Sequence, residues 1–128
     1  MFPMYDVRII NNEAILFEDD IEMNLESYRK DGDIRYTFAD GSCVAISRYN
    51  TIIWYGSNGK LHRDGDMPAH ITTNGLMVYC KHGKRHREFG PAIVYSDGSV
   101  EYWIDGIPYT KKDYIYKLNS RYGIIYHV

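Results

Sequence analysis

The hydrophobic positions of the chain fall into short runs that are separated by Asx-Gly pairs. The runs are rich in aromatic and β-branched side chains, which favour strands, and they are Tyr36–Phe38, Val44–Ser47, Thr51–Tyr55, Leu76–Tyr79, Ala92–Tyr95 and Val100–Ile104. An Asx-Gly pair supplies the positive φ values of a tight hairpin turn, and such pairs occur at Asp40-Gly41, Asn58-Gly59, Asn74-Gly75, Asp97-Gly98 and Asp105-Gly106. Strands and turns at this spacing predict an antiparallel meander of β-hairpins.

The N-terminal segment has a different pattern. The runs Asp6–Ile10 and Ala14–Phe17 flank Asn11-Asn12 and predict a first hairpin. The segment Asp19–Tyr28 then places apolar residues at helical spacing, which predicts a short amphipathic helix. These residues are Ile21, Leu25 and Tyr28.

The C-terminal segment predicts a helix over Lys111–Arg121. Thr110 followed by Asp113 resembles a capping box, and Gly123 is a typical helix end. One face of this helix carries an apolar stripe, formed by Tyr114, Leu118 and Tyr122. Residues 124–128 are expected to return as a strand.

The central segment contains an internal repeat of about 23 residues. Gly59-Lys60 recurs as Gly83-Lys84 after 24 residues, and Pro68-Ala69 recurs as Pro91-Ala92 after 23 residues. We therefore expect one domain over residues 1–128, with an N-terminal cap at 1–30, hairpin repeats at 31–109 and a C-terminal cap of helix and strand at 110–128.

The repeat has the form W/Y-Y-x-N-G-K-x-H-R-x-D-G-P-A and extends over Trp54–Lys112. This pattern resembles a hairpin-repeat family of tailed bacteriophages and large DNA viruses, and it is distantly similar to MORN-type repeats. The resemblance implies a β-hairpin fold and a viral origin, but no agreed biochemical activity. The second copy departs from the pattern at Phe89, and the third copy, which begins at Gly106, lacks the Lys and His-Arg positions.

Charge and composition exclude several classes of protein. The net charge of −2 over 128 residues argues against a general nucleic-acid binder. The charge is uneven, because Glu13–Glu26 is acidic and Lys81–Glu88 is basic. We expect no signal peptide at the N-terminus, and no apolar run in the sequence is long enough to span a membrane. Cys43 and Cys80 are far apart, which favours free thiols and the host-cell cytoplasm.

The basic segments and their aromatic neighbours are the candidate binding residues. Arginine and histidine at equivalent loop positions predict a site that clamps phosphate or carboxylate groups. The candidates are Trp54, His62, Arg63, Lys84, Arg85, His86, Arg87 and Trp103. The alternative is structural: each Arg pairs with the following acid, Asp64 or Glu88, and each His hydrogen-bonds turn backbone. Repetition favours the structural alternative, because every copy needs the same turn.

The candidate chemistry leads to two hypotheses. Because no complete catalytic or metal-binding set is present and no cofactor is implied, we favour a non-enzymatic, phage-type binding protein. It would hold an anionic small molecule such as a nucleotide signal, or a host protein, in counter-defence. The alternative is a small metal-independent nucleotide phosphodiesterase using His62 and His86 as acid and base. Exposed edge strands allow a homodimer.

Overall fold

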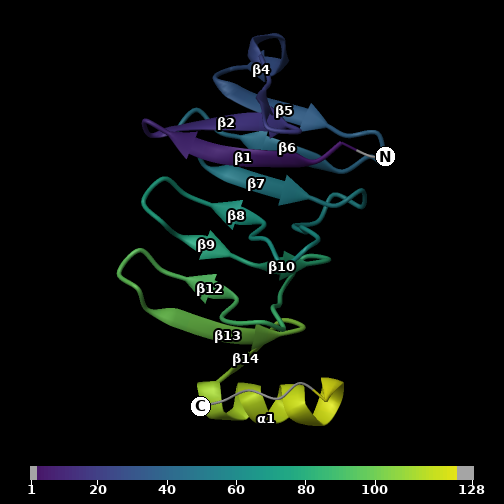
Figure 1. Cartoon of the computed structure of the whole chain (residues 1–128), viewed down its shortest axis with the longest axis vertical. Coiled ribbons are helices and arrows are strands. Elements are labelled where there is room, and N and C mark those ends of the chain that lie inside the picture. The colour runs from purple at the N-terminus through teal and green to yellow at the C-terminus, as the bar shows by residue number, and fades with distance from the viewer. Residues whose placement is uncertain (1–2, 124–128) are drawn as a thin grey trace.

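The computed structural model describes residues 3–123, and it is mainly antiparallel β structure with one α-helix. Nine strands form the main sheet in the order β14-β13-β12-β9-β8-β7-β6-β5-β4, which runs from the base to the top of Figure 1. These strands are β4 (Arg29–Lys30), β5 (Asp33–Thr37), β6 (Cys43–Ile46), β7 (Ile52–Tyr55), β8 (His70–Ile71), β9 (Met77–Val78), β12 (Ile93–Val94), β13 (Val100–Ile104) and β14 (Ile107–Tyr109). The predicted hairpin meander is therefore confirmed.

Sequence patterning located the longer strands, and its runs Leu76–Tyr79 and Ala92–Tyr95 contain the short strands β9 and β12. It missed several other short strands. A small hairpin of β10 (Cys80–Lys81) and β11 (Lys84–Arg85) projects between β9 and β12. The strands β4, β8, β10 and β11 have two residues each. A run of two residues has no alternation of apolar and polar positions, so hydrogen bonds to neighbouring strands are its only signature.

The predicted N-terminal hairpin is confirmed and covers one face of the main sheet. Strands β1 (Tyr5–Ile10) and β2 (Glu13–Glu18) pair in full register and lie across β5–β7 (Figure 1). Val7 and Leu16 of the hairpin share one buried cluster with Val44 of the main sheet. Burial of this apolar surface fixes the hairpin on the sheet.

The helix expected over Asp19–Tyr28 is wrong. Asp19 and Asp20 have φ values of 48° and 65° and form a tight turn, after which β3 (Ile21–Glu22) pairs with β2. Only Glu26–Tyr28 is helical, as a single 3-10 turn. Two consecutive residues of positive φ cannot begin an α-helix, so strand pairing overrides the helical spacing.

The Asx-Gly turns have the backbone that the sequence predicts. Gly41, Gly59, Gly75 and Gly98 have φ values of 89°, 79°, 102° and 87°. In each turn the preceding Asp or Asn side chain accepts a hydrogen bond from the backbone N–H two residues later. This geometry is the three-residue hairpin loop with glycine in the left-handed position.

The C-terminal helix α1 (Lys111–Tyr122) closes the base of the sheet (Figure 1). Thr110 Oγ1 accepts from the N–H of Asp113 at 3.1 Å, as the capping pattern predicts. Tyr114 and Leu118 are buried against Ile104 of β13. The helix ends at Gly123 in the left-handed conformation, and the strand expected at 124–128 lies outside the described residues.

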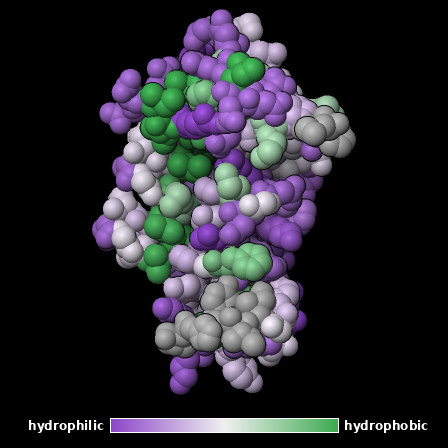
Figure 2. All heavy atoms as spheres, in the orientation of Figure 1, coloured by the Kyte–Doolittle hydropathy of each residue, from purple (hydrophilic) through white to green (hydrophobic). Residues whose placement is uncertain are grey.

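A row of apolar side chains crosses the main sheet and emerges from beneath the hairpin. Cross-strand pairing joins Ile52, Ile71, Met77, Val94 and Val100 on one face. Ile52 is fully buried, whereas Val100 is 42% exposed. Figure 2 shows hydrophobic side chains along the left side of the view, both over the hairpin and below it. The core is therefore concentrated at the N-terminal end.

None of the helices within residues 3–123 is long and apolar enough to cross a membrane.

The hydroxyl of Tyr114 ties α1 to the last loop, and we expect its removal to destabilise the protein. It lies 2.5 Å from the carbonyl oxygen of Arg87 and accepts from the N–H of Gly90 at 3.2 Å. Tyr114→Phe should lower the free energy of unfolding by about 1–3 kcal/mol, since buried partners lose their hydrogen bonds. Urea denaturation measures this change. Tyr116→Phe, at a residue that is 75% exposed, is the control, and equal effects of the two variants would contradict the assignment.

Candidate binding site

The two His-Arg pairs occupy equivalent places in the fold. The N–H of His62 donates to Trp54 O at 3.1 Å, and the N–H of His86 donates to Tyr79 O at the same distance. Trp54 lies in β7 and Tyr79 directly follows β9, so each pair is bonded to an aromatic residue at the end region of a strand. These contacts place the two pairs at successive levels along the sheet.

Both ring nitrogens of His62 are bonded within the protein. Nδ1 accepts from the backbone N–H of His82 at 3.0 Å, and Nε2 lies 2.8 Å from the carboxylate of Asp64. A ring nitrogen that accepts carries no proton, so the proton of this neutral imidazole lies on Nε2. The ring thus joins its own loop to the next hairpin turn.

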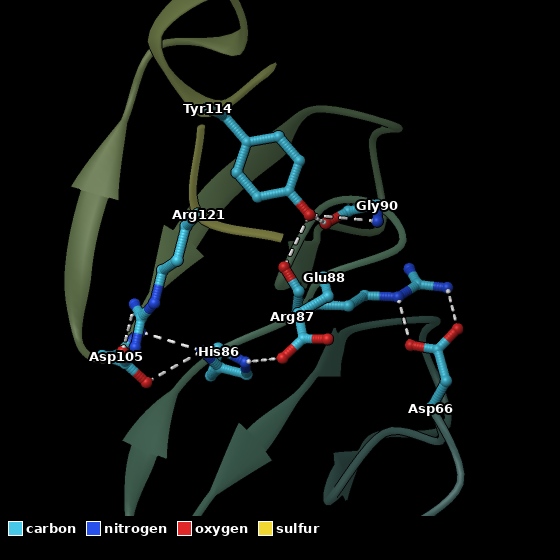
Figure 3. A network of polar contacts seen from close by, with 8 residues as sticks. All are labelled: Asp66, His86, Arg87, Glu88, Gly90, Asp105, Tyr114 and Arg121. Carbon is cyan, nitrogen blue, oxygen red and sulfur yellow. Dashed lines mark hydrogen bonds and ion pairs between the residues drawn. The ribbon is translucent and has the colours of Figure 1, made fainter. Parts of the chain in front are cut away.

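His86 repeats this arrangement one level lower. Its Nδ1 accepts from the N–H of Asp105 at 2.9 Å, and its Nε2 lies 3.1 Å from Glu88 (Figure 3). His86 is buried, with 8% of its surface exposed. Its imidazole is therefore already engaged in holding a turn, as the structural alternative predicts.

The arginine of each pair turns back onto the same aromatic residue whose carbonyl oxygen accepts from the histidine N–H. The Arg63 guanidinium lies 4.1 Å from the ring centre of Trp54 and donates to Pro68 O at 3.2 Å. It also pairs with Asp6 at 3.5 Å, and only 10% of its side chain is exposed. Burial lowers the pKa of Arg63, while the Asp6 carboxylate acts in the opposite direction.

Arg87 makes the same contacts with different partners. It lies 3.9 Å from the ring centre of Tyr79, donates to Pro91 O at 3.2 Å and pairs with Asp66 at 2.9 Å (Figure 3). Burial acts to lower the pKa of Arg87, but the bond to Asp66 together with the charges of Asp66, Tyr79 and Tyr114 outweighs it, and the pKa is raised.

The pairing of Arg63 with Asp64 and of Arg87 with Glu88 is wrong. In both loops the acid two residues after the histidine bonds to that histidine. The planar guanidinium instead takes a stacked position over an aromatic face, where its N–H groups reach a carbonyl oxygen. This leaves both arginines largely closed to an external anion.

Lys84, Arg85 and Trp103 lie at the small hairpin and β13. The Arg85 guanidinium lies 5.0 Å from the ring centre of Trp103. The Lys84 side chain lies across Gly106, 3.6 Å from the position that a Cβ there would take, and Lys60 lies across Gly83 in the same way at 3.3 Å. Lys60, Lys84 and Arg85 are exposed.

A cavity of about 750 Å³ brings together three of the predicted residues, Trp54, His62 and Arg63. It is bounded also by the start of β1, the β5–β6 loop and the turns that follow β7 and β10. A volume of this size is typical of small-molecule sites. Lys84, Arg85 and Trp103 do not line it. A neighbouring hollow of about 180 Å³ is lined by His86 and Arg87 together with His62 and Arg63, so it brings the two His-Arg pairs together.

The interior wall of this cavity is aromatic. The rings of Phe38 and Trp54 are stacked at 5.8 Å with an interplanar angle of 6°, and Tyr5 packs on Phe38 at 4.5 Å. Burial, with contributions from Tyr36 and Glu18, raises the pKa of Tyr5 to about 12. Tyr5 therefore presents a neutral phenol at neutral pH.

Trp54 also carries an unpaired donor, which is closed to solvent. Trp54 Nε1 is the single buried side-chain nitrogen or oxygen within residues 3–123 that has no hydrogen-bond partner. The two carboxylates at the mouth are already engaged, Asp64 with His62 and Asp40 with Ser42. The hydrogen bonds from Ser42 lower the pKa of Asp40.

Sequence reasoning missed Tyr5, Phe38, Asp40 and His82 as parts of this cavity. They come from three separate segments that meet only because the N-terminal hairpin folds over the sheet. Of these four residues, His82 is the one with a signal in the sequence, because His82-Gly83 recurs as Asp105-Gly106 after 23 residues.

No protein-family model matches the chain, and no curated protein or solved structure is significantly similar to it.

The contacts of Arg87 predict that it is a structural residue. Arg87→Ala removes the stack on Tyr79 and the bond to Pro91 O and leaves Asp66 without its guanidinium, so we expect a loss of about 2 kcal/mol in stability. Arg85→Ala, at an exposed neighbour, should cost less than about 1 kcal/mol. Thermal melting compares the two variants, and an unchanged melting temperature for Arg87→Ala would refute the structural role.

Proposed function

We propose that the protein is a non-enzymatic binding protein that holds an anionic small molecule, such as a nucleotide, in the cavity beside Trp54, His62 and Arg63. The observation that carries this proposal is the convergence of those three residues on one aromatic-walled cavity of about 750 Å³. A concave, largely apolar site with a few convergent polar groups is the usual form of a small-molecule site.

The preference for an anion is supported by the donors around the cavity. Lys60 and Lys81 are exposed on the turns next to the lining residues. Their ammonium groups are available to hold a phosphate or carboxylate at the mouth.

The bonds of the two imidazoles favour binding over phosphodiester cleavage. A general base needs a free ring nitrogen and a general acid needs a proton that it can release. His62 and His86 use both ring nitrogens within the protein. The phosphodiesterase hypothesis would require each ring to release a turn or an acid before it reacts.

The biological setting of this proposal rests on the resemblance of the repeat alone. That resemblance supports a viral protein acting in the host cytoplasm, with counter-defence as its role and a host protein as the alternative partner. Edge strands such as β4 support a homodimer as a further proposal.

Filling the mouth of the cavity tests the proposal. Ser57 is an exposed lining residue, so Ser57→Trp should leave the fold intact and abolish nucleotide binding. Ser96→Trp, at an exposed turn residue outside the cavity, is the matched control. Isothermal titration calorimetry with a panel of nucleotides and other small anions gives the affinities, and mass spectrometry shows whether the ligand is recovered intact. Equal binding by both variants would exclude the cavity, and conversion to products would overturn the non-enzymatic assignment.

A further inference from the structure

Five hairpins within residues 3–123 close with two residues that both have positive φ. This is the geometry of a type I′ turn, which strongly prefers Asn, Asp or Gly at its first position. The five turns are Asn11-Asn12, Asp19-Asp20, Asp31-Gly32, His82-Gly83 and Asp105-Gly106. Four of them follow the preference, and His82, with φ of 51°, is the exception.

The equivalent turn one level lower shows what the fold itself requires at this position. The backbone N–H of Asp105 donates to His86 Nδ1 at 2.9 Å, and the Asp105 carboxylate pairs with Arg121 at 2.6 Å (Figure 3). Asp105 thus satisfies both the turn and its neighbours. Nothing in the hairpin geometry calls for an imidazole there.

The His82 ring has no such internal role. It stacks on His62 with ring centres 4.4 Å apart, it is exposed, and it lines the cavity. Among residues 3–123 the ring forms no hydrogen bond or ion pair. Within residues 3–123 the stack on His62 is therefore the contact that the ring gains for this departure from the turn preference. A residue that breaks a local rule without a compensating hydrogen bond is where a functional role is expected.

We propose that His82 contacts the ligand at the mouth of the cavity, and that the ligand portion held inside is the heteroaromatic ring of a nucleotide. This inference rests on the proposed function. The aromatic wall of Tyr5, Phe38 and Trp54 suits a flat ring, because bases pack on aromatic side chains whatever their sequence. The imidazole of His82, beside the Lys60 side chain that crosses Gly83, is placed to meet the ring edge or the phosphate.

The substitution His82→Asn separates this role from the fold. Asparagine is favoured at the first position of the turn, so the melting temperature should be unchanged or higher. Affinity for the nucleotide should fall about tenfold to a hundredfold, as expected for one lost ring contact. Asp31→Asn, in an equivalent turn far from the cavity, is the matched control and should bind normally.

The probes are the four nucleoside 5′-monophosphates, their nucleosides and inorganic phosphate, measured by calorimetry on the full chain. Competition by a nucleoside together with weaker binding by His82→Asn supports the inference. Normal nucleotide binding by His82→Asn overturns the role of His82, and phosphate binding as tight as nucleotide binding overturns the ring site; in both cases the proposed function stands. A further outcome is that another anion binds the wild-type protein while no nucleotide does. If Ser57→Trp blocks the binding of that anion, this inference fails and the proposed function stands. If no anion binds the wild-type protein, the proposed function fails with it.

Discussion

A guanidinium stacked on an aromatic ring is the interaction on which the arrangement of the loops depends. Arg63 covers Trp54, and Arg87 covers Tyr79. Each guanidinium also bonds the proline carbonyl at the far end of its own loop, which holds the loop against the strand. The strands β8, β9 and β12 have two residues each and therefore form few hydrogen bonds with their neighbours. The buried guanidinium holds the loop in place where these short strands alone do not.

The same arginines connect successive levels, and the ends of the array are completed by residues from outside it. Arg87 reaches Asp66 in the loop one level above. Arg63 has no such loop above it and pairs with Asp6 of the N-terminal hairpin. At the lower end the hydroxyl of Tyr114 meets Arg87 O and Gly90. Both caps therefore match the polar groups that the terminal levels expose, as repeat arrays require.

The sequence predicted the elements with strong local signals and failed where long-range contacts decide. The Asx-Gly turns, the N-terminal hairpin and the capped helix are local features, and all are confirmed. The segment Asp19–Tyr28 has helical spacing, but two aspartates of positive φ form a turn, and Ile21–Glu22 after it pairs as a strand. The cavity could not be predicted from the sequence, because Tyr5 and Phe38 meet Trp54 only after the N-terminal hairpin has packed on the sheet.

The use of the His-Arg pairs within the fold changes which residues are candidates for recognition. A residue that makes the same internal contacts at each level is needed by the fold. We therefore expect ligand recognition at positions that differ between equivalent levels. Trp54 stands where the next level has Tyr79, and its Nε1 is unpaired. His82 stands where the next level has Asp105, and its ring is unbonded within the described residues. Both differences line the same cavity. In our proposal a specific site arises where two equivalent levels of the sheet differ, because a feature present at both levels would be present twice on the surface.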